Sequence, residues 1–324
     1  MLRLASSSVR HCWFAGTALL LLAACGRNDP SALQGAATEP AAAVRQLADY
    51  LQQGDLAGFA RAAVPPAEHA QLVQAWSDGD SLWPLTSLPL DDHLPELLAV
   101  LAADNAEADL QRAFKAQFEG QGSNLRQTAH SLGMFGAQYV GHQGDYTPLQ
   151  REHYRQLVTG LSRWASQAPL SDPALAKVAI TRLTTVVAAS GLDGVAALQA
   201  AGMEPALEKL GPVQQAVLEV LASYDLDLRQ SLAGLKVGLL QEQGEQALVQ
   251  VEYPLAGQVV SFQAQMQRVD GRWYMAQNLE DARRLLAAAQ QARAQRQAEA
   301  AVEPAGAQEP AEPAAQDGQM ASAP

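Results

Sequence analysis

The segments Gln246–Tyr253 (QALVQVEY) and Val259–Arg268 (VVSFQAQMQR) decide the fold class of this chain. In both, apolar and polar residues alternate, which is the period of a β-strand with one buried and one solvated face. Asp270-Gly271 follows, a preferred dipeptide for a type I′ hairpin turn, and leads directly into Arg272–Met275 (RWYM). We therefore predict that three antiparallel strands lie here, with the glutamines on the solvated face.

The residues on either side extend this unit. Leu232–Glu242 (LAGLKVGLLQE) is expected to supply a first strand, turned by Gln243–Glu245, which gives a four-stranded antiparallel meander. Asn278 is expected to cap a final Ala-rich helix that covers the apolar face of the sheet. This order of elements loosely resembles the sheet half of NTF2-like modules, which are common in bacterial lipoproteins. The resemblance implies an architecture and no particular activity.

Residues 41–233 instead show helical spacing, with caps and breakers between the apolar segments. Thr147–Gln150 (TPLQ) is a capping box with proline at the first helical position, and Asp172-Pro173 starts a helix that Gly191 ends. The chain is therefore predicted to be α+β: a mainly helical body over 41–233, then the antiparallel sheet and a C-terminal helix over 234–300.

Two helices near the middle of the chain carry apolar stripes that we expect to face the core. In the helix that Ser123 begins, the predicted stripe consists of Leu125, Ala129, Leu132, Gly136 and Tyr139. In the helix after Pro148, it consists of Leu149, Leu157, Leu161 and Trp164. Trp76, Trp83, Trp164 and Trp273 are assigned to the core, with an exposed contact role for Trp83 as the alternative.

The N-terminus has three features in a fixed order. Arg3 and Arg10 make it basic, an apolar run over Trp13–Leu22 follows, and Leu22-Ala23-Ala24-Cys25 ends the run. The run has the length of the apolar part of a signal peptide and is too short to span a bilayer. The last four residues resemble the lipobox of bacterial lipoproteins.

This resemblance implies that residues 1–24 are a signal peptide and that a lipid is attached to the thiol of Cys25. Ordinary secretory cleavage after Ala24, or an uncleaved anchor, are the alternatives. Gly26 follows the cysteine instead of the aspartate associated with inner-membrane retention, so the resemblance implies the outer membrane, periplasmic face. Because Cys12 lies in the segment to be removed, the mature chain is expected to contain no disulfide.

The two ends of the mature chain differ in composition from its body. Residues 25–40 have no apolar period and are expected to form a flexible tether, and residues 301–324 are rich in Ala, Pro, Glu and Gln and are expected to be disordered. The formal net charge is −12. An acidic chain has no electrostatic reason to bind nucleic acid, so the membrane is the expected partner, through the lipid on Cys25.

One group of residues invites a chemical interpretation. His142 and Asp145 share a glycine-bounded loop, His130 lies on the helix before it and His153 on the helix after it. Convergence of these four would give a metal site or an acid–base pair. Ordinary helix–loop packing is the interpretation we prefer, so the expectation is no metal and no catalytic residue.

A second group is acidic. Between Arg61 and Arg112 there is no lysine or arginine, and the segment 68–109 contains DGD at 78–80 and DDH at 91–93. Hard cations need clustered oxygen ligands, but the spacing lacks the D-x-D-x-D-G calcium loop and its closing glutamate. Cation binding and a solvated acidic face are the two alternatives, and we prefer the second.

The sequence contains no H-E-x-x-H, G-x-S-x-G, S-x-x-K or glycine-rich phosphate loop. We therefore expect a lipid-anchored cell-envelope protein without enzymatic activity or cofactor, a binding or accessory module for an envelope protein or a cell-wall component. The alternative is a small-ligand-binding or hydrolytic protein with a pocket near His130, His142, Asp145 and His153.

Overall fold

The computed structural model describes residues 37–87, 93–142 and 146–302. All of them belong to one compact unit, Gly35–Pro324, so the helices and the sheet are parts of the same unit. The predicted signal peptide, Cys25, Asp145 and the tail from 303 onward lie outside the described residues, as do most of the tether and both aspartates at 91–92.

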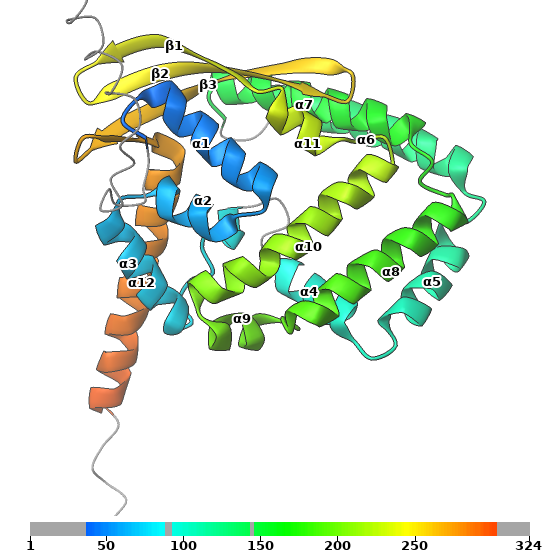
Figure 1. The fold of residues 1–324 in the computed structure, drawn as a ribbon, viewed down its shortest axis with the longest axis horizontal. Helices are drawn as coiled ribbons and strands as arrows, with labels where there is room; N and C mark the ends of the chain where they lie inside the picture. The colour runs from blue at the N-terminus through cyan, green and yellow to red at the C-terminus, as the bar shows by residue number, and fades with distance from the viewer. Residues whose placement is uncertain (1–36, 88–92, 143–145, 303–324) are drawn as a thin grey trace, which may run out of the picture. The chain divides into compact units, whose positions relative to one another are not determined.

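The order of elements confirms the predicted α+β class (Figure 1). Helices come first, then a sheet, then one last helix. The helices before the sheet are α1 (Pro40–Gln53), α2 (Leu56–Ala63), α3 (Pro66–Ser77), the 3-10 turn η1 (Leu85–Ser87), α4 (Leu94–Ala102), α5 (Ala106–Gln117), α6 (Gly122–His142), α7 (Pro148–Gln167), α8 (Pro173–Ser190), α9 (Val195–Ala201), α10 (Met203–Ser223) and α11 (Leu228–Ala233). The strands are β1 (Lys236–Gln243), β2 (Gln246–Leu255), β3 (Gln258–Val269) and β4 (Arg272–Met275), and α12 (Ala276–Val302) follows.

The sheet is the predicted antiparallel meander, in the order β1-β2-β3-β4. Its alternation is also as predicted, because Ala247, Val249 and Val251 are buried on one face. The predicted start of the first strand is wrong. Leu232 lies in α11, where the side chain of Asp227 accepts a hydrogen bond from the backbone N–H of Gln230 and caps a short helix.

The apolar face of the sheet is covered by α1 and α7, and this corrects the prediction that the last helix covers it. Ala43 and Val44 of α1 pack with the inward residues of the sheet and with Trp273. The helix α12 starts at Ala276, directly after β4, so Asn278 does not cap it. Its buried side chains, Leu279, Ala282, Leu286 and Ala289, join the helical core instead, and Figure 1 shows α12 running beside α3.

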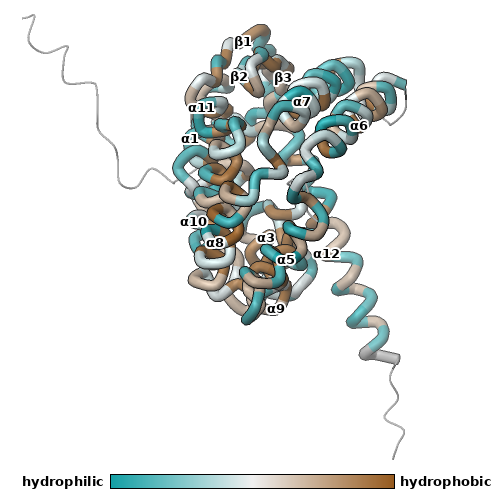
Figure 2. The backbone as a smooth tube through the Cα atoms, turned by 90° about the vertical axis from the view of Figure 1, so that its right-hand side faces the viewer, coloured by the Kyte–Doolittle hydropathy of each residue, from teal (hydrophilic) through white to brown (hydrophobic). Residues whose placement is uncertain are grey.

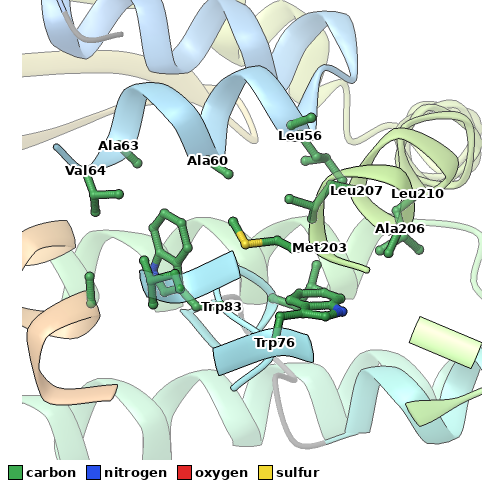
Figure 3. Close-up of a cluster of buried hydrophobic side chains, with 14 of the residues drawn as sticks. Leu56, Ala60, Ala63, Val64, Trp76, Trp83, Met203, Ala206, Leu207 and Leu210 are labelled. Atoms are coloured by element: carbon green, nitrogen blue, oxygen red, sulfur yellow. The ribbon is translucent and has the colours of Figure 1, made fainter. Parts of the chain in front are cut away.

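The helical core gathers around two tryptophans (Figure 3). The Trp76 side chain is fully buried and its Nε1–H donates to the carbonyl oxygen of Leu198 at 2.9 Å. Trp83 is 2% exposed, which confirms the core assignment and makes its alternative role as an exposed contact residue wrong. Met203 and Leu207 of α10 lie between these rings and the α2 side chains.

The length and apolar composition of the described helices can be compared with those of a bilayer span. None of them alone combines the length and the apolar composition of a bilayer span, whereas α8 and α9 meet that test only as a pair bent by 45°.

Candidate functional site

The predicted histidine group lies on a helical hairpin, α6 and α7. Figure 2 shows α7 between the sheet and α6. His130 and His142 are exposed on α6, whereas His153 is half-buried on the α7 side that faces the sheet. Asp145 lies outside the described residues. Among the residues that are described, no three His, Cys, Asp or Glu side chains come together as metal ligands would.

The hairpin is built by local hydrogen bonds. Thr147 and Gln150 form the predicted capping box: Gln150 N–H donates to Thr147 Oγ1 at 3.3 Å, and Thr147 N–H donates to Gln150 Oε1 at 2.9 Å. Arg151 donates to the carbonyl oxygens of Val140 and Gly141, both at 2.9 Å, and of Tyr146 at 3.2 Å. These bonds satisfy the last carbonyls of α6, which have no partner within the helix.

Close packing between the two helices depends on glycine. A Cβ atom at Gly133 would lie 2.0 Å from Ser162 Oγ, and one at Gly136 would lie 3.0 Å from Val158 Cγ1. The Ser162 hydroxyl donates across the contact to the carbonyl oxygen of Ala129 at 2.8 Å.

This contact corrects the predicted stripe of α6. The helix presents Ala129, Gly133 and Gly136 to α7 and buries Val140, while Leu132 is 65% exposed and Tyr139 is 52% exposed. Phe135, one turn from each, is 69% exposed. Leu149 and Leu161 of α7 are also exposed, and only Leu157 and Trp164 of that predicted stripe pack against the core. Apolar spacing alone does not reveal that small residues make the closest contact.

His153 takes part in an aromatic cluster between α7 and the sheet. Its Nε2 lies 3.1 Å from the Tyr253 hydroxyl, and its ring stacks on Phe262 with centroids 4.6 Å apart. Tyr253 and Phe262 meet edge to face at 6.4 Å. Gln156 of α7 accepts from the backbone N–H of Ser261 at 2.8 Å, so the helix also satisfies part of the edge of β3.

Burial sets the protonation of this pair. It lowers the pKa of His153 below its ordinary value, so the imidazole is neutral at pH 7. It also raises the pKa of Tyr253 to about 12, so the phenol keeps its proton. A neutral imidazole and a neutral phenol share a hydrogen bond without a charged partner, which is an arrangement suited to packing a helix on a sheet.

Another half-buried histidine lies at the contact between α2, α3 and α10. His69 Nε2 is 3.8 Å from Glu204 Oε1, too far for a hydrogen bond, and Arg61 is 3.3 Å from the same carboxylate oxygen. Burial lowers the pKa of His69, and the glutamate only partly opposes this. No sequence motif predicts this group, because Glu204 lies far along the chain from Arg61 and His69.

The acidic segment performs a structural task in its described part. Asp80 accepts two hydrogen bonds from Arg296, both at 2.8 Å, and lies 3.4 Å from Arg293. Asp78 pairs with Arg293 at 2.6 Å. The Arg296 hydrogen bonds lower the pKa of the Asp80 carboxyl. Both aspartates of DGD therefore hold α12 against the end of α3.

Comparison with known proteins gives no relative for this chain. No family model matches it, and neither a curated protein nor a solved structure is significantly similar to it.

Proposed function

We propose that this chain is a lipid-anchored cell-envelope protein that faces the periplasm and serves as a non-catalytic binding or accessory module. The single observation that carries the proposal is the order of features in residues 1–25: a basic start, an apolar run of signal-peptide length, and Leu22-Ala23-Ala24-Cys25. Acylation of Cys25 attaches the body to the outer membrane. Since one acyl chain holds a protein only marginally, stable anchoring needs more than one.

The contacts of two of the candidate chemical groups favour a structural role for each. His153 is engaged by Tyr253 and Phe262, and Asp80 is engaged by Arg293 and Arg296. Each of these groups therefore has a structural partner that explains its position. The expected partner of the module is another envelope protein or a cell-wall component.

The test compares the two cysteines of the chain in the same bacterial host. Cys25→Ser should abolish incorporation of labelled palmitate and release the protein from the membrane fraction. Cys12→Ser is the matched control, because it lies in the segment that is removed, and it should leave labelling and fractionation unchanged. Persistent labelling of the Cys25→Ser variant, or loss of labelling in Cys12→Ser alone, would contradict the proposal.

A further inference from the structure

A cavity of about 360 Å³ lies at the end of the sheet where α12 begins, and half of the residues that line it are glutamines. This volume lies in the range of small-ligand sites. Its lining contains the side chains of Gln241, Gln243, Gln246, Gln265 and Gln267, with Leu248 among them. The buried side of the sheet contributes Ala247 and Met266, and α12 contributes Ala276 and Glu280.

The strand register places these glutamines in two rows across the sheet. Gln246 pairs with Gln243 on one side and Gln267 on the other, which forms the first row. In the second row, Leu248 pairs with Gln241 and Gln265. The rows are neighbours on one face, because residues two apart along a strand point to the same side.

The five amide groups are free to bind a ligand. Gln267 is half-buried and the other four glutamines are exposed. Throughout the part of the chain that the structure describes, none of the five side chains has a hydrogen-bond partner in the protein. Each primary amide offers two donors and an acceptor, so the two rows present both to a ligand.

The charge of the lining restricts the ligand. Among the described residues that line the cavity, Glu280 is the only one with an ionisable side chain, and none is a lysine or an arginine. A phosphate or carboxylate ligand would find no cation, and a hard metal ion would find a single carboxylate where it needs several oxygen ligands. What remains complementary is a neutral molecule rich in hydroxyl and amide groups.

We propose that this cavity binds a neutral oligosaccharide, with hydroxyl and acetamido groups bonded to the two glutamine rows and the apolar side of a sugar ring over Leu248. The expectation that the saccharide belongs to the cell-wall glycan rests on the proposed envelope location. The Glu280 carboxylate, at the α12 side, accepts hydrogen bonds from sugar hydroxyls. A peptide is a poorer match, because peptide grooves anchor apolar side chains in pockets, whereas half of the lining residues here are glutamines.

The experiment is isothermal titration calorimetry of the lipidated full chain in detergent micelles, with a β-1,4-linked N-acetylglucosamine tetramer as the probe. The wild-type chain should bind with a saturable heat at one site. The Gln241→Ala/Gln265→Ala variant should bind at least about tenfold more weakly, since it loses two or more hydrogen bonds. Gln263→Ala is the matched control, on the same face but outside the cavity lining, and should bind within about twofold of wild type.

A second variant guards against a folding defect. Gln265→Thr keeps a strand-forming residue at the position and should weaken binding about threefold or more, with the thermal midpoint unchanged. Absence of saturable binding to the wild-type chain, an equal loss in Gln263→Ala, or equally tight binding of a neutral Gly/Ser/Thr peptide would overturn the proposal. Sugar binding should not depend on the lipid anchor, so we expect a Cys25→Ser chain to bind the same sugar.

Discussion

At the residue scale, His153 and Phe262 show how the helical hairpin is attached to the sheet. The two rings stack, and the imidazole shares its hydrogen bond with the Tyr253 hydroxyl. The alternation of β3 predicts that Phe262 points inward, but it does not predict that a histidine from a distant helix covers it. That pairing depends on tertiary packing, for which the sequence has no local signal.

His153 should make stability depend on pH. Its folded pKa lies below the value near 6.5 of the unfolded chain, so the unfolded chain binds more protons between these two values. The neutral imidazole therefore contributes fully to the free energy of unfolding above about pH 6.5. This contribution is lost as the pH falls through the range between the two pKa values. We expect the free energy of unfolding, measured with urea, to differ less between pH 7.5 and pH 5.0 in His153→Gln than in the wild-type chain.

The control for this experiment is His130→Gln, an exposed position on α6. It should change the free energy of unfolding by less than about 0.5 kcal/mol at pH 7.5. An unaltered pH difference in His153→Gln would mean that the burial of His153 does not contribute to the pH dependence of stability.

Phe262 and Gln263 test the two faces of β3. Phe262→Ala removes a half-buried ring that stacks on His153, and should cost roughly 2–3 kcal/mol, less than the 3–5 typical of a completely buried phenylalanine. Gln263→Ala, on the opposite face, should cost under about 0.5 kcal/mol. Chemical denaturation measures both, and equal costs would show that the register assigned to β3 is wrong.

At the element scale, the hairpin of α6 and α7 is held by close approach of backbones. Sequence spacing correctly predicts that both helices exist and where α7 begins, because caps are local. It places Ala129 and Gly136 correctly on the face toward α7 but wrongly adds Leu132 and Tyr139, and it misses Gly133, whose small size allows the closest contact with α7. Leu132, Phe135 and Tyr139 are left at the surface as a consequence.

Gly133→Ala should therefore reverse the usual effect of replacing a helical glycine. At an open helical position, alanine stabilises by about 0.5–1 kcal/mol. At Gly133 its Cβ would overlap Ser162, with Oγ at 2.0 Å and Cβ at 2.4 Å, so we expect a loss of about 1–3 kcal/mol.

Gly141→Ala is the matched control, in the same helix, because no atom lies within 4 Å of the Cβ position, and it should be neutral or stabilising. Adding Ser162→Gly to Gly133→Ala should recover part of the loss. If Gly133→Ala and Gly141→Ala unfold at the same denaturant concentration, the described contact between α6 and α7 is wrong.

At the scale of the whole molecule, the sequence predicts the order of helices and strands along the chain better than the contacts between them. The period of two in β2 and β3 identifies the meander, and the helical body before it follows from caps and breakers. Which helix covers the sheet could not be predicted: both α1 and α12 have apolar faces, and Ala43 and Val44 of α1 occupy the position expected for α12. The ion pairs of Asp78 and Asp80 with α12 likewise join residues that are distant in sequence.

Lipidation of Cys25 is tested most directly by tandem mass spectrometry of the protein extracted from membranes. Trypsin cuts after Arg10 and Arg27. We predict a peptide Cys25–Arg27 that carries lipid on its thiol, and no peptide from residues 1–24. A peptide His11–Arg27 with a free Cys25 thiol, in place of the lipidated fragment, would contradict the account.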